Sequence, residues 1–454
     1  MAGSKKAKNN QMSKTKKIKI VCLGCAKNNV DAEVMAGILE EGGIEIVDGD
    51  APADTVLINT CSFIDKAKQE SIETILNASR LKENGEIKKI IVTGCLPQRY
   101  GGELQKEMPE IDAIAGINDI PRIMDYVSSG KESSPRKKDP PTFIYDHKLP
   151  RKKFTPPGIS YIKVSDGCSN RCSYCSIPAI RGNFRCREIK SIVSEAARLA
   201  RDGTVEINLI AQDLTAFGNG NNNGENLKTL LSELEKINGL KWIRPLYLYP
   251  SKIDNELIDI IASSEKICKY FDIPIQHSED RILKKMGRKY GRQDIEELMA
   301  RIRERVPDAV LRTSLITGFP GESKEEFNSL LEFIKIARFD TLGTFTYSRE
   351  IGTPAYSFKG HVSKKEAMRR ALEIENAQRE ISAARNRNLI GTVNEAIVER
   401  KSEETGFYEG RIKSQAPDVD GITFIQGKKL VPGKIYKVEI VSSVDFDLTA
   451  EVVK

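Results

Sequence analysis

Short apolar runs, each followed by a stretch with helical periodicity, recur along most of this 454-residue chain. The first three runs are IKIVCLG (18–24), TVLINT (55–60) and KIIVTG (89–94), with helical stretches near 30–41, 63–82 and 98–107. None of the runs alternates apolar and polar residues, which is typical of strands that are buried on both faces of a parallel sheet. We therefore predict an N-terminal parallel-sheet α/β domain over residues 17–132.

The same alternation resumes after a segment at 131–158 that is rich in Pro and Lys and has no periodicity, which predicts a linker. Six more candidate strands lie at 159–164, 205–211, 243–249, 269–274, 310–318 and 341–347. Six strand–helix units predict a partial, open (β/α)6 barrel over residues 154–385. In such a barrel the active face lies at the carboxyl ends of the strands.

The last block of the chain, from about residue 388, has a different pattern. Five short strands follow one another with turn residues between them: TVNEAIVER, FYEGRIKS, GITFIQG, KIYKVEIVSS and FDLTAEVVK. This spacing predicts a small antiparallel β-barrel over residues 388–454, of a kind that binds oligonucleotides or peptides. The predicted fold class is α/β, with three domains.

The cysteines and the N-terminus indicate the cellular compartment. The N-terminal segment lacks an apolar signal core, and no apolar run approaches the ~18 residues that span a bilayer, so we expect a cytoplasmic protein and no membrane partner. In a reducing compartment, nine cysteines serve as metal ligands or buried thiols more often than as disulfides. The net charge of +7 is compatible with a nucleic-acid or ribosomal partner but does not require one.

Three cysteines, Cys168, Cys172 and Cys175, follow the first predicted strand of the barrel in the segment SDGCSNRCSYCSIPAIRG. Their C-x3-C-x2-C spacing on one loop lets three thiolates converge on one iron–sulfur cluster and leaves its fourth ligand position open. The alternative is a structural zinc site, but no clear Cys or His partner follows at zinc spacing.

A second set of cysteines lies in the first domain. Cys25, Cys61 and Cys95 each end one of the first three predicted strands, and parallel sheets gather functional groups at the carboxyl ends of their strands. We therefore expect a second cluster with three cysteine ligands, although three isolated buried thiols are the alternative. The remaining Cys22, Cys186 and Cys268 are predicted to be small core residues.

These motifs together resemble the methylthiotransferase family of radical S-adenosylmethionine enzymes. The resemblance covers residues 18–454 and rests on GCAKNNVDAE, NTCSFIDKAKQESI, TGCLPQRY, GCSNRCSYCSIPAIRG, NLIAQD, YLYPSKI, DIPIQHSEDRIL and TSLITGFPGE. It implies two 4Fe-4S clusters and two uses of S-adenosylmethionine, one as methyl donor and one as radical source. Such enzymes put a methylthio group on an unactivated C–H bond, which acid–base catalysis cannot break. The C-terminal barrel would then be TRAM-like and dock the substrate.

The resemblance also implies contacts with S-adenosylmethionine and an electron donor. GFPGE, which ends at Glu322, looks like the family segment that contacts the cofactor, although a plain strand–helix turn is the alternative. Gln212 ends a barrel strand and is expected to face the cofactor or to have a structural hydrogen bond. Tyr174 is expected near the adenine through its backbone, or as a packing ring. No general base is assigned, and the expected electron donor is a flavodoxin or ferredoxin.

The substrate divides the family into branches. One branch, called MiaB, modifies an adenosine derivative in transfer RNA, and another, called RimO, modifies an aspartate at its β-carbon in the small-subunit ribosomal protein number twelve. The motifs NTCSFIDKAKQESI, YLYPSKI and IPIQHSEDRIL resemble the RimO branch. Residues 388–454 hold nine Lys and Arg against eleven Asp and Glu, a net charge of −2, which favours a basic protein over RNA. A non-catalytic iron–sulfur carrier is the alternative of another class, but carriers saturate their irons with protein ligands.

Overall fold

The computed structural model describes residues 16–128, 140–219, 224–403 and 406–453. Backbone contacts divide the chain into two compact units. The first unit holds the chain up to Ser62, residues 66–138 and residues 149–152, and the second holds residues 63–65, 139–148 and 153–454. In the described ranges, every helix is too short or too polar to cross a membrane.

The first unit contains a five-stranded parallel sheet in the order β2-β1-β3-β4-β5. The strands are β1 (Lys17–Cys22), β2 (Glu45–Val47), β3 (Thr55–Thr60), β4 (Lys89–Gly94) and β5 (Ala113–Ile114). The three strands predicted from apolar runs are β1, β3 and β4, and they are direct neighbours in the sheet. The sequence pattern does not predict β2 and β5, because three and two residues are too few to form a recognisable apolar run.

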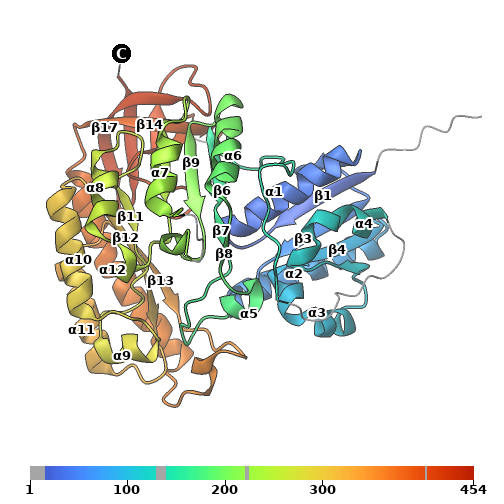
Figure 1. The fold of residues 1–454 in the computed structure, drawn as a ribbon, viewed down its shortest axis with the longest axis horizontal. Helices are drawn as coiled ribbons and strands as arrows, with labels where there is room; N and C mark the ends of the chain where they lie inside the picture. The colour runs from blue at the N-terminus through green and yellow to red at the C-terminus, as the bar shows by residue number, and fades with distance from the viewer. Residues whose placement is uncertain (1–15, 129–139, 220–223, 404–405, 454) are drawn as a thin grey trace, which may run out of the picture. The chain divides into compact units, whose positions relative to one another are not determined.

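Helices cover both faces of this sheet, as the uninterrupted apolar runs predict (Figure 1). They are α1 (Ala26–Glu41), α2 (Asp65–Glu83), α3 (Cys95–Glu107) and α4 (Ile123–Ser128). On one face, Val56, Ile58 and Val92 pack against apolar side chains of α2 and α3. The alternate residues Leu57 and Ile91 point to the other face, where they are fully buried and where α1 contacts the sheet.

The second unit begins with six parallel strands that lie side by side in chain order. They are β6 (Ile159–Lys163), β9 (Glu206–Ile210), β10 (Trp242–Pro245), β11 (Tyr270–Asp272), β12 (Val310–Thr317) and β13 (Thr341–Thr346). They form two three-stranded sheets that a parallel bridge between Ile243 and Ile267 connects. Among the described residues no pairing joins β6 to β13, so the barrel is partial and open, as predicted.

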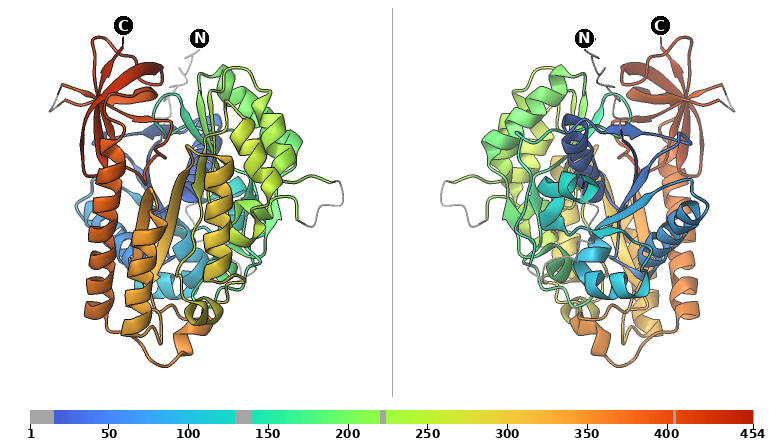
Figure 2. Two further views of the ribbon diagram at one scale, coloured as in Figure 1. Left: turned by 90° about the vertical axis from the view of Figure 1, so that its left-hand side faces the viewer. Right: turned by 90° about the vertical axis from the view of Figure 1, so that its right-hand side faces the viewer.

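The helices of the half-barrel pack on its outer surface (Figures 1 and 2). The long ones are α6 (Ile189–Arg201), α7 (Leu227–Glu235), α8 (Asn255–Ser263), α10 (Arg292–Arg305), α11 (Lys324–Ala337) and α12 (Lys364–Arg387). Residues that alternate along the strands, such as Ile207, Leu209 and Leu311, point outward and share one apolar core with these helices. Because side chains alternate along a strand, the intervening Glu206, Asn208 and Arg312 point to the inside of the half-barrel.

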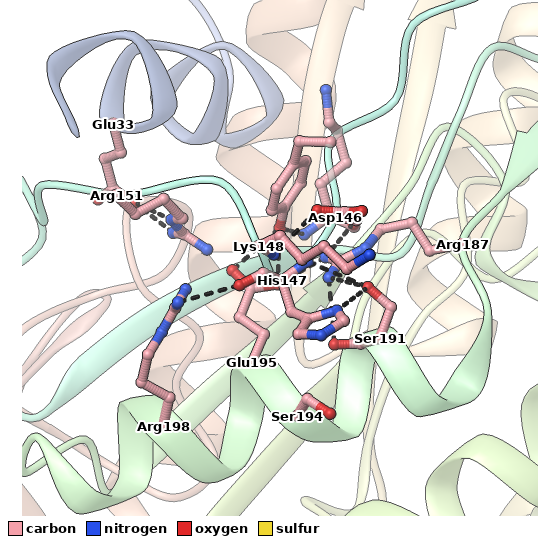
Figure 3. A network of polar contacts seen from close by, with 12 residues as sticks. Glu33, Asp146, His147, Lys148, Arg151, Arg187, Ser191, Ser194, Glu195 and Arg198 are labelled. Atoms are coloured by element: carbon pink, nitrogen blue, oxygen red, sulfur yellow. Dashed lines mark hydrogen bonds and ion pairs between the residues drawn. The ribbon is translucent and has the colours of Figure 1, made fainter. Parts of the chain in front are cut away.

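The segment before β6 is fixed to α6 by a buried polar network (Figure 3). Arg187 Nη1 donates to Glu195 Oε2 over 2.6 Å. The Tyr145 hydroxyl lies 3.2 Å from the same carboxylate oxygen. The backbone N–H of His147 donates to Ser191 Oγ over 3.1 Å. Residues 140–148 of the predicted linker therefore belong to the second unit, where Tyr145 and His147 contact α6, whereas residues 149–152 belong to the first unit. The earlier part of the linker lies outside the described residues.

The C-terminal block forms a closed five-stranded barrel in the order β14-β15-β16-β18-β17. Its strands are β14 (Val393–Lys401), β15 (Tyr408–Ile412), β16 (Thr423–Gln426), β17 (Ile435–Val444) and β18 (Asp447–Val452). All five predicted strands are present. The prediction of a purely antiparallel barrel is wrong for one pair, because β16 and β18 run parallel and close the barrel between them.

This small barrel lies against the amino ends of the half-barrel strands. Arg411 Nη2 pairs with Glu206 Oε2 at 2.6 Å, and Arg244 Nε pairs with Glu206 Oε1 at 3.1 Å. The hydroxyl of Tyr161 donates to Asp418 Oδ2 and that of Tyr270 to Asp420 Oδ2, each over 2.6 Å. The C-terminal barrel therefore closes the floor of the half-barrel, at the end opposite to its active face.

Candidate metal centres

The loop that carries Cys168, Cys172 and Cys175 follows β6 and the short β7 (Ser165–Asp166), at the carboxyl end of the half-barrel. Backbone hydrogen bonds fasten the loop at several points. Cys168 N–H donates to Gly182 O over 3.2 Å, and Ser173 N–H donates to Met286 O over 2.9 Å. Cys175 N–H donates to Cys172 O over 3.1 Å, so the three cysteines share one compact turn.

The three thiols lie close enough to influence one another. Burial and the neighbouring Cys172 raise the pKa of Cys175 to about 12, and burial raises the pKa of Cys168 as well. Two donors face the sulfurs: Ile177 N–H lies 3.4 Å from Cys175 Sγ, and Arg288 Nη1 lies 3.5 Å from Cys172 Sγ. Such donors favour the thiolate form, which is the form that binds metal.

The chemistry of the donor set fits an iron–sulfur cluster. Cys168, Cys172 and Cys175 supply three thiols from one loop, and thiolates are the usual protein ligands of such clusters. The soft sulfur donors and their N–H partners therefore fit a four-iron cluster with three protein ligands.

A fully buried carboxylate anchors the start of the cysteine loop. Asp166 Oδ2 lies 3.0 Å from Lys163 Nζ and 3.2 Å from Arg181 Nη1, and Asp166 Oδ1 accepts from Gly167 N–H over 3.0 Å. Burial alone would raise the pKa of Asp166, but the charges of Lys163 and Arg181 lower it below its usual value. No pattern in the sequence points to these charged residues, whose importance depends on the burial of Asp166.

Gln212, predicted to face the cofactor, lies beside this anchor. Its Nε2 donates to Asp166 Oδ1 over 2.8 Å, while its buried Oε1 has no partner among the residues that the structure describes. The next residue, Asp213, accepts from Asn170 Nδ2 and from Lys252 Nζ, each over 2.8 Å. Asp213 thus holds the middle of the cysteine loop, because Asn170 lies between Cys168 and Cys172.

Glu322, also predicted to bind the cofactor, is turned into the protein. Its carboxylate accepts from the N–H of Gly318 and lies 3.4 Å from Arg370 Nη1 and 3.7 Å from His277 Nε2. These contacts fix the backbone of the GFPGE turn. Tyr174 packs against an apolar cluster that includes Met286 and Phe319, which matches its alternative role as a packing ring.

Unpartnered polar atoms gather near the active face of the half-barrel. Among the described residues, no partner faces either amide atom of Asn208, and the same holds for Gln212 Oε1, Ser278 Oγ and the Tyr347 hydroxyl, all of which are buried atoms. A buried polar atom without a partner is costly, so these positions need a polar ligand or water. The amino, carboxylate and ribose groups of S-adenosylmethionine are such ligands, and the site fits this cofactor.

The second predicted set lies in the first unit, at the carboxyl edge of its sheet. Cys61 and Cys95 directly follow the neighbouring strands β3 and β4, and Cys25 lies three residues after β1 and caps the start of α1. Cys61 and Cys95 are buried, whereas Cys25 is exposed. Cys95 Sγ lies 3.6 Å from Asn28 Oδ1, and Asn28 Nδ2 donates to Thr60 O over 2.9 Å.

A glycine allows the turn before Cys25 to lie directly against Cys61. Gly24 has a φ of +92°, and a Cβ at this position would lie 2.9 Å from Cys61 Sγ. The turn before Cys25 therefore comes directly against Cys61 only because residue 24 has no side chain. The strand order β1-β3-β4 brings together three cysteines that lie far apart in the sequence.

Of the three cysteines left out of both sets, Cys268 is buried in the core, whereas Cys22 and Cys186 are half-buried. Burial raises the pKa of Cys22 and of Cys268. The thiol of Cys22 donates to Asn29 Oδ1 over 3.0 Å, and Cys268 is fully buried. Cys186 is half-buried on the short strand β8 (Arg185–Cys186) and packs against the large apolar core.

Three family models match successive parts of the chain. Residues 17–116 match the uncharacterized protein family UPF0004, residues 162–334 match the radical SAM superfamily, and residues 390–453 match the TRAM domain. The second match covers the half-barrel and its cysteine loop. It implies one 4Fe-4S cluster and S-adenosylmethionine for this part of the molecule.

Among solved structures, the chain is similar to the radical S-adenosylmethionine methyltransferase TsrM from Kitasatospora setae, with a TM-score of 0.56 and 17% identity over 75% of this chain and 77% of that one. It is also similar to the cobalamin-dependent S-adenosylmethionine radical enzyme OxsB, with a TM-score of 0.52 and 13% identity over 80% of this chain and 56% of that one. At these identities the likeness concerns the fold alone.

Curated relatives match the chain from end to end. A ribosomal protein uS12 methylthiotransferase RimO from Pelobacter propionicus is 46% identical over 97% of this chain and 99% of its own length. The protein of the same name from Geobacter sulfurreducens is 47% identical over 96% and 98%, and that from Caldicellulosiruptor saccharolyticus is 45% identical over 96% and 100%. At these identities over nearly its whole length, the chain belongs to the RimO family of methylthiotransferases.

Proposed function

We propose that this protein adds a methylthio group to the β-carbon of an aspartate in ribosomal protein uS12, with S-adenosylmethionine as cosubstrate. The observation that carries the proposal is the 46% and 47% identity, over nearly the whole chain, with proteins named ribosomal protein uS12 methylthiotransferase RimO. The two sets of three cysteines support it, because each set leaves one position of a four-iron cluster open.

The proposal assigns each set of cysteines its own 4Fe-4S cluster. Cys168, Cys172 and Cys175 hold the cluster at the half-barrel, and Cys25, Cys61 and Cys95 hold a second one in the first unit. The proposed domains are residues 17–132, 154–385 and 388–454. Reduced cluster and S-adenosylmethionine together supply a radical, which breaks a C–H bond that has no acidic proton and no leaving group.

The side chains around the half-barrel site bind and orient rather than transfer protons. Asp166 and Asp213 hold the cysteine loop in place through Gly167 and Asn170. Gln212 and Asn208 offer unpaired amide atoms to the polar groups of S-adenosylmethionine. Glu322 acts through the backbone of the GFPGE turn, and Tyr174 contributes packing next to the loop.

Two further assignments belong to the same proposal. The clusters receive electrons from a small carrier protein such as a flavodoxin or a ferredoxin, since their chemistry consumes electrons. The protein works in the cytoplasm, where its ribosomal substrate is made and where free thiols persist.

The test offers two substrates to the purified, anaerobically reconstituted enzyme together with S-adenosylmethionine, reductant and sulfide. We expect a methylthio mass increase on one aspartate-containing peptide of uS12, located by tandem mass spectrometry, and none on transfer RNA. Protein without reconstituted clusters is the control. A methylthio group on transfer RNA with none on uS12 would assign the chain to the other substrate class.

A further inference from the structure

Arg288 lies beside one of the cysteines of the half-barrel site. It follows α9 (Asp280–Lys285), in a segment whose Lys285 and Met286 carbonyls accept hydrogen bonds from Ser173 in the cysteine loop. Its Nη1 points to Cys172 Sγ at 3.5 Å. The other two nitrogens are also fixed, since Nε donates to the Tyr290 hydroxyl and Nη2 donates to Pro274 O.

Two tyrosine rings cover the guanidinium group of Arg288. Its central carbon lies 4.5 Å from the ring centroid of Tyr249 and 5.1 Å from that of Tyr290. The two rings pack edge to face with centroids 5.6 Å apart, and both are buried. The rings attract the cation and keep water from it, so its charge acts strongly on whatever lies at its open edge.

The charge of Arg288 lacks a carboxylate partner in the described part of the chain. Other arginines inside this unit are paired: the buried Arg244 and Arg411 with Glu206, and the half-buried Arg312 with Asp272. A cation shielded from water is costly unless a negative group compensates it. The atom that faces Arg288 and can carry negative charge is the sulfur of Cys172, once it is a thiolate.

We propose that Arg288 is a positioning and charge-compensating residue for the half-barrel cluster, acting through Cys172. This inference rests on the proposed function, because it takes Cys172 as a cluster ligand. The hydrogen bond and the positive charge hold the Cys172 thiolate in place. They also stabilise the reduced, more negative state of the cluster relative to the oxidised state, which makes its reduction easier.

The test measures the midpoint potential of this cluster alone. Full-length protein with Cys25, Cys61 and Cys95 replaced by Ala keeps the half-barrel cluster, whose potential can be followed by electron paramagnetic resonance. In this background Arg288→Gln should lower the midpoint potential, and Arg288→Lys, which keeps the charge, should restore most of the loss. Lys289→Gln is the matched control, because this exposed neighbour loses the same charge in water and should leave the potential unchanged.

A second measurement does not depend on whether the Gln variant folds. Wild-type protein grown with ¹⁵N-arginine should show a ¹⁵N coupling to the reduced cluster in pulsed paramagnetic resonance, and Arg288→Lys should remove it. An unchanged potential in Arg288→Gln with full iron content, or no ¹⁵N coupling, would overturn this inference alone. Full iron content after Cys172→Ala would instead overturn the assignment of the ligands in the proposed function.

Discussion

At the scale of single residues, Asp166 is the centre of a buried cluster of charges that no pattern in the sequence predicts. Its carboxylate has three cations within 3.6 Å, from Lys163, Arg181 and Arg185, and it is fully buried. Burial of so much charge is costly unless every partner stays in place. The carboxylate therefore serves the site by fixing the residues that enter and leave the cysteine loop.

Replacing Asp166 by Asn should destabilise the protein strongly. The buried cations lose their shared counter-charge, and we expect a loss of about 3–5 kcal/mol in the free energy of unfolding. Denaturant unfolding measures it. Asp259→Asn is the control, since Asp259 pairs with Arg305 at the surface and its loss should cost at most about 1 kcal/mol. Equal losses in the two variants would contradict the anchoring role of Asp166.

The cysteines allow a second prediction at this scale, with iron as the readout. Reconstituted wild type should hold about eight iron atoms from two four-iron clusters. Changing Cys168, Cys172 and Cys175 to Ala should leave about four and abolish cleavage of S-adenosylmethionine. Changing Cys25, Cys61 and Cys95 should also leave about four but preserve that cleavage.

Cys22→Ala and Cys268→Ala are the matched controls for the iron measurement. Neither thiol belongs to a predicted ligand set and burial raises the pKa of both, so iron content should stay at the wild-type value. A triple variant that keeps all its iron would remove the corresponding set from the list of ligands.

These residues also show the limit of prediction from sequence. The six cysteines can be predicted as ligands from the sequence, because that prediction needs only their local spacing and their position after apolar strands. Asp166 and Arg288 cannot, because their importance depends on partners that the fold brings to them, such as Arg181 and Cys172. A charged residue in a sequence gives no sign of whether it will be buried or what will pair with it.

At the scale of elements, the strands and helices were the easiest part to predict. Each apolar run became a parallel strand, because helices cover both faces of the first sheet and the outer face of the half-barrel. The relation between the C-terminal barrel and the half-barrel could not be predicted. It depends on the contacts of Arg411 with Glu206 and of Tyr161 with Asp418, pairs separated by 205 and 257 residues in the chain.

The C-terminal barrel forms part of the floor of the half-barrel, and truncation at residue 387 should therefore destabilise the half-barrel.

A point substitution tests the floor more sharply than truncation does. Arg411→Ala removes one of the two cations that pair with the buried Glu206. Burial alone would raise the pKa of Glu206, but the charges of Arg411 and Arg244 lower it below its usual value. We expect the free energy of unfolding to fall by about 3–5 kcal/mol, because an uncompensated charge stays buried. Arg400→Ala, which removes an arginine paired with Glu409 on an exposed edge, should cost at most about 1 kcal/mol in the same denaturant experiment. Similar losses in the two variants would show that the Arg411–Glu206 pair stabilises the protein no more than an exposed ion pair does.

At the scale of the whole molecule, the charge of the C-terminal barrel must be separated into inner and outer groups. Asp418 and Asp420 accept hydrogen bonds from tyrosines of the half-barrel, and Glu399 pairs with Arg411. The net charge counted from the sequence includes these inner carboxylates, whose charge already faces a partner within the second unit. Glu439 and Glu451 are different, because they are exposed and lie opposite each other on β17 and β18.

Reversing this outer pair tests which kind of substrate the barrel meets. Like charges on opposite strand positions repel, and a basic partner would relieve that repulsion. With Glu439 and Glu451 changed to Lys, modification of basic uS12 should slow by up to about tenfold at low salt, because opposite charges speed the encounter. The defect should shrink near 1 M salt, where screening acts within roughly 3 Å.

The control is the double variant Glu297→Lys with Glu304→Lys, which makes the same charge change on exposed positions of α10. It should have little effect on the rate. Rates of uS12 modification at the two salt concentrations decide the matter. A faster reaction in the barrel variant would mean that this face meets a polyanion such as RNA, and would exclude charge steering of uS12 by the barrel.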